Sequence, residues 1–295
     1  SVNIELEDKG NKIIVLLTVR GLKGGHSGIE IHKERGNSNK IMGRILKDLS
    51  SKVDFNMQSI NGGSKNNAIP REMDTVIAIK NSDLEKVKTI VSNWQDLLLN
   101  ELKTQDPEIK VSFEEIEDSA KKVFTKECTK KVVDLLYLYP NGINTRSVEI
   151  EGLVESSINL GVVTTLEDVV EFDSAIRSSV ASLKEEITLK AKTITKLVGA
   201  EFETTAGYPE WQYNSNSKLR DICQRVHGEI YGKEAEIVAI HAGVECGLFN
   251  EKLGGLDMIS FGPNLYDVHT PKEHMSISSV ESIWKYLKAV LKELK

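Results

Sequence analysis

The segment Gly21-Leu22-Lys23-Gly24-Gly25-His26-Ser27-Gly28 joins a predicted strand to a predicted helix, and the rest of the chain is organised around it. Before it, residues 12–20 (KIIVLLTVR) form a β-branched run of strand length. After it, residues 37–46 open a helix, with Asn37 or Ser38 placed to cap the first turn. Because three glycines precede the histidine, the backbone can bend freely, and we expect the imidazole of His26 at an exposed corner.

Strands and helices continue to alternate after this segment. The patterns predict strands at 55–60, 74–79 and 109–113, and a helix from Ser82 to Leu102. Apolar residues of that helix recur every three or four positions, which indicates one buried stripe. Residues 11–115 therefore read as βαββαβ.

The next stretch repeats this order less regularly. A helix at 125–137, strands at 148–160 and 169–176, a helix at 182–197 and a strand at 201–205 are predicted. We interpret 116–205 as a second α/β unit from the order of its elements alone. After Ala206 the chain predicts helices at 217–231 and from Ser276 onward, with strands at 236–240 and 256–261. This remainder resembles a parallel sheet without its other half.

Composition limits the classes of function. The 295 residues carry a net charge of −6, spread along the chain, which argues against a nucleic-acid partner. No apolar run approaches the roughly 18 residues that a membrane span needs, and there is no basic-then-apolar export signal. The three cysteines are widely separated and form no CxxC pair, so we expect reduced thiols and a cytoplasmic protein.

Few residues stand out for chemistry. Of six histidines, His26, His241 and His269 lie where a predicted strand ends, the position at which open α/β sheets bind ligands. His269 could be a metal ligand, but one histidine does not hold a metal, and the chain has no HxD, HxxH or HExxH motif. GxSxG, Walker and GxGxxG motifs are also absent from the sequence.

Seven short motifs in order carry a resemblance. They are GGHSG (24–28), NAIPRE (67–72), NLGVV (159–163), IRS (176–178), GYPEW (207–211), HAGVECGLF (241–249), and GP (262–263) followed by HTP (269–271). Together they resemble the aminoacyl-histidine dipeptidases (Xaa-His dipeptidases) of the M20 metallopeptidases. The resemblance implies a duplicated, ferredoxin-like βαββαβ lid followed by part of a zinc-peptidase α/β catalytic domain.

The resemblance also implies roles for individual residues. His26 matches a lid histidine that stabilises the oxyanion of the tetrahedral intermediate. Asn67 matches a substrate-binding asparagine, and Arg177 an arginine that clamps the substrate carboxylate. Glu245 matches a loop that lines the substrate pocket. His269 matches the last zinc ligand of the family, although Lys272 stands where the family has an acidic residue.

The same resemblance implies the organisation of the whole enzyme. Residues 1–10 would end an N-terminal catalytic segment or form an opening strand, 11–205 would be the lid, in halves 11–115 and 116–205, and 206–295 would close the catalytic domain. The segment that carries most ligands of the two zinc ions is absent, so we expect this chain alone to retain no zinc and to be inactive.

The expected substrate is a dipeptide ending in histidine, and a homodimer is possible. Two alternatives remain: another M20 peptidase or aminoacylase activity, and a catalytically silent binding or dimerisation module.

Overall fold

The computed structural model describes residues 1–117, 120–205, 207–238, 245–266 and 273–294. The chain divides into two compact units. Unit 1 comprises residues 1–206 with 240–242, and unit 2 comprises 207–239 with 243–295. Within the described residues, no helix combines the length and apolarity needed to cross a membrane.

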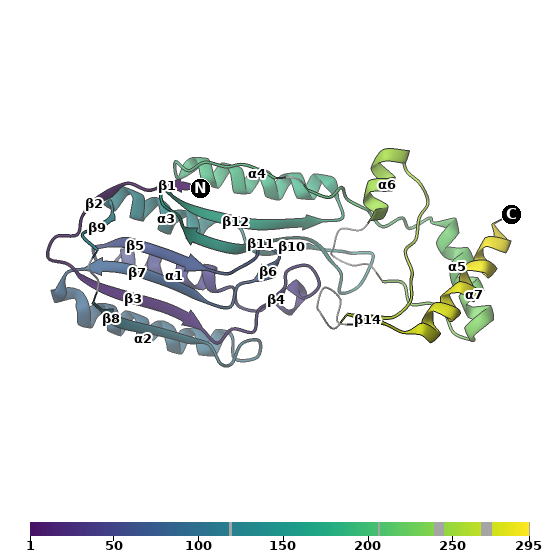
Figure 1. Cartoon of the computed structure of the whole chain (residues 1–295), viewed down its shortest axis with the longest axis horizontal. Helices are drawn as coiled ribbons and strands as arrows, with labels where there is room; N and C mark the ends of the chain where they lie inside the picture. Colours follow the sequence, from purple (N-terminus) through teal and green to yellow (C-terminus); the bar gives the residue numbers. More distant parts are fainter. Residues whose placement is uncertain (118–119, 206, 239–244, 267–272, 295) are drawn as a thin grey trace. The chain divides into compact units, whose positions relative to one another are not determined.

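Unit 1 is built on one sheet of eight strands, in which every pair of neighbouring strands is antiparallel. Its strand order is β1-β12-β11-β5-β7-β3-β8, with β10 also paired to β11. These strands are β1 (Val2–Asn3), β3 (Ile13–Arg20), β5 (Phe55–Gly62), β7 (Met73–Ile79), β8 (Lys110–Ile116), β10 (Gly142–Arg146), β11 (Val154–Thr165) and β12 (Val169–Ser178). Figure 1 shows β5 and β11 side by side in the middle of this sheet, where two antiparallel residue pairs join them.

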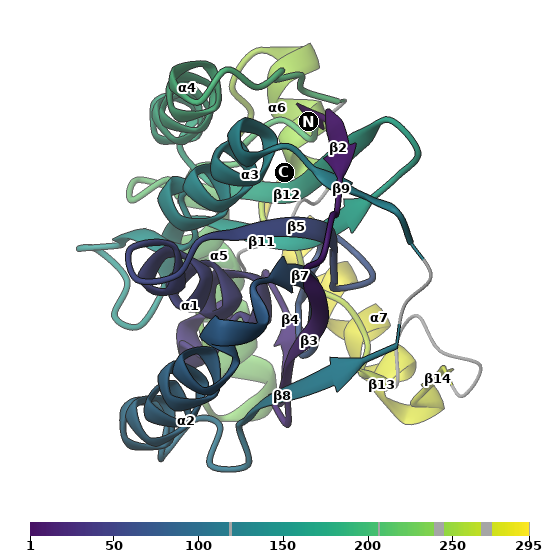
Figure 2. The same cartoon turned by 90° about the vertical axis from the view of Figure 1, so that its left-hand side faces the viewer.

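Four helices cover one face of the sheet, as Figure 2 shows end on. They are α1 (Ser38–Ser50), α2 (Leu84–Glu101), α3 (Lys126–Leu138) and α4 (Ala181–Leu197). Alternate residues of β3 point to the helices, and the apolar stripe of α1 packs into the same core. The side chain of Asn37 caps α1 by accepting a hydrogen bond from the N–H of Lys40 at 3.1 Å. The short strands β4 (Gly25–His26) and β6 (Ala68–Ile69) lie beyond the ends of β3 and β7, as Figure 1 shows.

The first half of unit 1 has the element order that its sequence predicts. The elements run β3, α1, β5, β7, α2 and β8, and the strands lie in the order β5-β7-β3-β8 with antiparallel neighbours. This is the arrangement of a βαββαβ ferredoxin-like unit. The Ile109–Phe113 strand belongs to this half alone as β8, because it pairs with β3 and lies at one edge of the sheet.

The second half departs from the predicted order at both ends. The strand predicted at 148–160 lies instead at 154–165 as β11, preceded by β10. No strand forms at 201–205, because among the described residues only one pair of backbone hydrogen bonds, between Ser1 and Glu201, joins this segment to a neighbour. The outer neighbour of β12 is the two-residue β1 from the start of the chain. Short strands also pair as β2 (Leu6–Asp8) with β9 (Lys122–Phe124).

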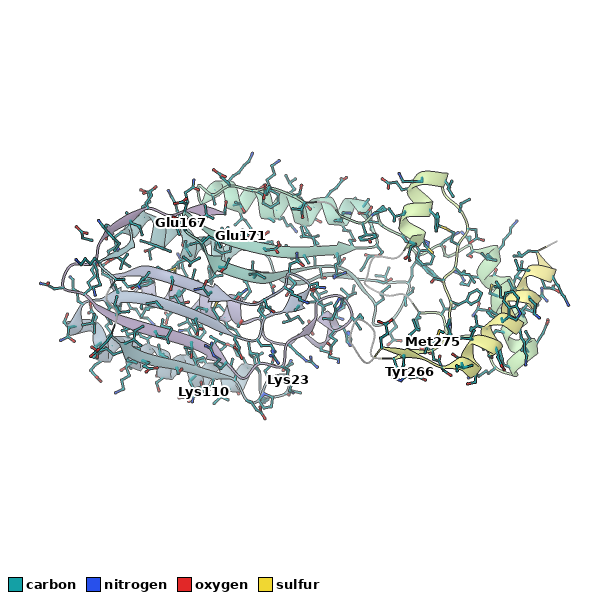
Figure 3. All side chains as sticks on the ribbon, in the orientation of Figure 1. Lys23, Lys110, Glu167, Glu171, Tyr266 and Met275 are labelled. Carbon is teal, nitrogen blue, oxygen red and sulfur yellow. The ribbon has the colours of Figure 1, made fainter. Side chains whose placement is uncertain are left out.

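Unit 2 has a small core. Helices α5 (Lys218–Tyr231) and α7 (Ile277–Glu293) pack through Cys223, Val226, Tyr286 and Val290. The other described elements are α6 (Glu245–Leu253) and the hairpin of β13 (Leu265–Tyr266) with β14 (His274–Met275), whose Tyr266 and Met275 are labelled in Figure 3.

Two strands predicted in this unit do not form. Residues 236–238 and 256–261 are irregular, and the remaining residues 239–240 of the first strand lie outside the described residues. Their apolar side chains Val238 and Leu256 stay exposed, because the described part of unit 2 offers them no neighbouring strand.

Candidate functional site

The segment with His26 forms a small platform together with the segment that contains Asn67. Strand β4 (Gly25–His26) pairs antiparallel with β6 (Ala68–Ile69), with His26 opposite Ala68. The N–H of Ser27 also donates to the carbonyl of Asn67 at 2.9 Å. Ile31, from a short 3₁₀ helix η1 (Ile31–Lys33), packs with Ile69 against Val154 at the start of β11. The structure therefore brings the segments of His26 and Asn67 together.

The hydrogen bonds of His26 determine which ring nitrogen carries its proton. Its Nδ1 lies 3.2 Å from the N–H nitrogen of Gly28 and 3.1 Å from that of Ile29. Because a backbone N–H can only donate, Nδ1 is the unprotonated acceptor, and the proton of the neutral ring is on Nε2. The half-buried imidazole is thus oriented by its own loop to act as an Nε2–H donor.

A carboxylate fixes the backbone of the same loop. Oε2 of Glu30 accepts from the N–H of His26 at 3.0 Å, and its Oε1 lies 2.8 Å from Nζ of Lys33 and 3.3 Å from Arg35. The hydrogen bond from Lys33, followed by the one from the His26 backbone, lowers the pKa of Glu30. The carboxylate is therefore charged at neutral pH and holds the turn closed after His26.

The loop with Asn67 is held from below by a buried amide of β11. The Nδ2 of Asn159 donates to the carbonyls of Asn66 and Ala68, both at 2.8 Å, on either side of the exposed Asn67. The loop lies very close to the strand: a Cβ on Gly161 would be 2.5 Å from Cα of Asn66. Asn159 and Gly161 thus position a loop that lies 93 residues away in sequence from Asn159.

Arg177 lies near the end of β12, on the same sheet face as this loop. Val170, Phe172 and Ile176 of β12 pack on the helical side, so alternation places Asp173 and Arg177 on the other side. Asp173 accepts from Nδ2 of Asn66 at 3.3 Å, which confirms that this face lies under the loop. Figure 3 labels Glu171 on β12, six residues before Arg177 and toward the opposite end of the strand.

The guanidinium of Arg177 is available for an anion. Its Nε is buried without a hydrogen-bond partner, and within the described part of the chain the structure records no ion pair for it. Burial alone lowers the pKa of Arg177, since no carboxylate of the described residues lies beside it to offset the loss of water. A half-buried cation without a counter-charge is stabilised by an incoming carboxylate or phosphate, which a guanidinium binds with two hydrogen bonds.

Comparisons with known proteins identify relatives of this chain. Residues 17–106 match the peptidase dimerisation domain of the M20 type. The chain is 36% identical over 278 residues to the cytosol non-specific dipeptidase of Escherichia coli (strain K12), covering 94% of this chain and 57% of that protein. It superposes on the crystal structure of aminoacylhistidine dipeptidase from Vibrio alginolyticus with a TM-score of 0.93 and 35% identity, over 99% of this chain and 59% of that one. The chain is a homologue of these M20 dipeptidases. It spans less than two thirds of the length of either relative.

Of the two site residues expected in unit 2 of this M20 dipeptidase homologue, the structure describes Glu245 but not His269. Glu245 is not in a loop: it is the first residue of α6, where an acidic side chain complements the positive end of the helix, and it is exposed. His269, the expected zinc ligand, lies outside the described residues. Among the residues that are described, no group of three histidine, cysteine, aspartate or glutamate side chains could hold a metal ion. The described residues therefore do not by themselves fit a zinc site.

Sequence reasoning missed the residues that position the site. Asn159 and Gly161 fall in a motif that carries the resemblance, but nothing in the sequence connects them to Asn67. Asp106, which holds the ends of the His26 loop, belongs to no motif. Its only local signal is its place between a helix and a strand, next to Pro107.

Proposed function

We propose that this chain supplies the substrate-closing part of a cytoplasmic, zinc-dependent dipeptidase that cleaves dipeptides ending in histidine. The names of the two relatives support a dipeptidase, one of them an aminoacylhistidine dipeptidase. The structural observation that carries the proposal is the half-buried guanidinium of Arg177, which has no counter-charge among the described residues. A dipeptide has a free carboxylate one residue from its scissile bond, and Arg177 would bind that carboxylate.

His26 and Asn67 act on the other part of the substrate in this proposal. The Nε2–H of His26 would donate to the oxygen of the scissile carbonyl, which gains negative charge as the carbonyl is attacked. The exposed amide of Asn67, held beside His26, would hydrogen-bond the substrate backbone. Glu245 is proposed to line the pocket, and His269 to bind zinc in a longer protein. The described residues do not assemble the metal site, so these roles concern only groups of this chain that bind and orient the substrate.

The expected partner of the chain is a second copy of itself. The match of residues 17–106 to a dimerisation domain supports a homodimer. We also propose that residues 11–205 act as one lid and that 206–295 close the catalytic domain.

A broader dipeptidase is the second candidate, because the Escherichia coli relative is named non-specific. The two candidates differ in the side chains that the pocket accepts. Alanyl-histidine and alanyl-leucine, compared at equal concentration, distinguish them.

The test compares this chain with a version extended to the length of its relatives. We expect the extended protein to bind about two zinc ions and to cleave alanyl-histidine, and this chain to do neither. Arg177→Met in the extended protein should raise KM at least about tenfold for the dipeptide, since a charge-assisted hydrogen bond contributes about 1.5–3 kcal/mol. The matched control is Arg225→Met, because Arg225 is an exposed arginine of α5 whose ion pairs, with Glu229 and Glu293, lie within unit 2. An extended protein that folds and binds the dipeptide without cleaving it would favour a silent binding module.

A further inference from the structure

The two ends of the His26 loop meet at one buried carboxylate. The N–H of Lys23 donates to Oδ1 of Asp106 at 2.8 Å, and the N–H of Gly36 donates to Oδ2 at 2.7 Å. Residues 23–36 leave the sheet after β3 and return to the start of α1, so these bonds close the base of the loop. Lys23 is labelled in Figure 3 at the same end of the sheet as Lys110, whose partner across the strands is Arg20.

Asp106 is itself rigidly held. Its own N–H donates to the carbonyl of Leu102 at 2.8 Å, and its carbonyl accepts from Ile109 at 3.1 Å, which fixes the turn between α2 and β8. The side chain is 0% exposed. Within the described residues no lysine or arginine pairs with it, so the two backbone N–H groups are what compensates its burial.

Within the loop itself, the guanidinium of Arg35 donates to the carbonyl of Gly24, so one further hydrogen bond crosses the loop near its base. The contacts nearer its tip, such as the β4–β6 pairing and the Glu30 turn, hold His26 to Asn67 and to its own loop. They do not connect the loop to α2 and β8. The packing at the base is tight, because a Cβ on Gly36 would lie 2.9 Å from a methyl group of Leu22 and 3.0 Å from one of Leu102. Asp106 thus provides the polar contact that joins the loop to the turn between α2 and β8.

We infer that Asp106 is a positioning residue for His26: its carboxylate closes residues 23–36 into a loop that holds the imidazole in place beside the segment of Asn67. Asp106 is fully buried, so it acts through the loop. The catalytic part of this inference rests on the proposed function. Because Arg177 lies on β12, outside the loop, opening the base should impair the step that His26 assists more than carboxylate binding.

Asp106→Asn tests the inference with almost no change in volume. The amide keeps one acceptor oxygen, but its NH₂ group faces the second backbone N–H, so one bond is lost and one donor is left unpaired. Asp106→Glu is the second variant, since it keeps the charge but displaces it by one methylene. Asp96→Asn is the matched control, an exposed residue of α2 ten positions earlier.

The first measurement is amide hydrogen exchange and ¹⁵N relaxation on the present chain. In Asp106→Asn we expect at least about tenfold faster exchange at Lys23 or Gly36 and increased motion of His26, with β3 and β7 amides unchanged. Asp106→Glu should give a smaller effect and Asp96→Asn none. Unchanged exchange at both amides, or unchanged motion of His26, would overturn the inference whether or not the protein is a dipeptidase.

The second measurement is dipeptide hydrolysis by the extended protein. We expect Asp106→Asn to lower kcat at least about tenfold with KM within about twofold, and Asp106→Glu to recover part of kcat. A kcat equal to that of the unaltered protein, despite a mobile His26, would contradict the catalytic part. If the unaltered extended protein cleaves no dipeptide, the proposed function fails, and the exchange and relaxation results decide the inference by themselves.

Discussion

Replacing Asn159 by alanine should destabilise unit 1 by about 2–4 kcal/mol. The side chain is 1% exposed, and its Nδ2 makes two hydrogen bonds of 2.8 Å to the carbonyls of Asn66 and Ala68. Alanine removes both donors. A carbonyl that loses its partner costs about 1–3 kcal/mol when it is buried, and the lower part of that range applies here because Asn66 is exposed and the loop can relax toward water. For a unit of about 200 residues this corresponds to a fall in Tm of roughly 4–16 °C.

The assay is urea unfolding followed by tryptophan fluorescence. Trp94 is in unit 1, whereas Trp211 and Trp284 are in unit 2, so replacing those two by phenylalanine restricts the signal to unit 1. The control is Asn144→Ala, because Asn144 is an exposed asparagine with a 3.2 Å bond to Ser156. A loss below about 0.5 kcal/mol for Asn159→Ala, or a loss equal to that of the control, would refute the reasoning that this amide holds the Asn67 loop.

Two further predictions concern tight contacts in unit 1. Gly161→Ala should destabilise unit 1 by about 1–3 kcal/mol and speed amide exchange at residues 65–68. The reason is that the new Cβ, 2.5 Å from Cα of Asn66, displaces the loop by about 1 Å. Unchanged amide exchange at residues 65–68 would contradict this prediction. Lys40 donates to the carbonyls of Leu136, Tyr137 and Tyr139 at 2.6–2.8 Å, and burial lowers the pKa of its ammonium from 10.5 to about 8. Between pH 8 and 10.5 the unfolded chain therefore binds more protons at this residue than the folded one, so the free energy of unfolding should rise with pH, by up to about 3 kcal/mol relative to Lys40→Met in urea titrations. Equal pH profiles of the two proteins would show that burial does not shift this group.

Much of unit 1 was predictable because its pattern is local. The β-branched run at 12–20 alternates between two faces of β3, and the apolar stripe of 84–98 matches one side of α2. Asn37 caps α1 with its side chain, one of the two caps that the sequence allows. In each case the residues that determine the element lie within about one turn or one strand of each other.

Strands that need a distant partner were predicted less well. Residues 201–205 and 256–261 have the composition of strands, but a strand exists only where another backbone pairs with it. At 201–205 the neighbouring backbone of the described residues offers only Ser1. Apolar alternation shows that a segment prefers an apolar surface, and it does not show whether that surface is present.

The candidate site divides in the same way. His26, Asn67 and Arg177 were proposed from motifs, whereas Asp106 contacts two residues, 83 and 70 positions away, only through their backbone N–H groups. Every residue except proline has that donor, so the partners of Asp106 leave no signature in the sequence.

A last prediction follows for Lys23. Its side chain is exposed, and its N–H is the group that contacts Asp106, so Lys23→Ala should leave stability and the motion of His26 unchanged. Lys23→Pro removes the donor and should have the effect of opening the loop: at least about tenfold faster exchange at Gly36 and a more mobile His26. Both variants are measured by amide exchange and relaxation. Lys33→Pro is not a suitable control for the proline, because it would disturb η1. If alanine at position 23 mobilises His26 as much as proline does, the side chain and not the backbone donor carries the contact, and the role assigned to Asp106 is wrong.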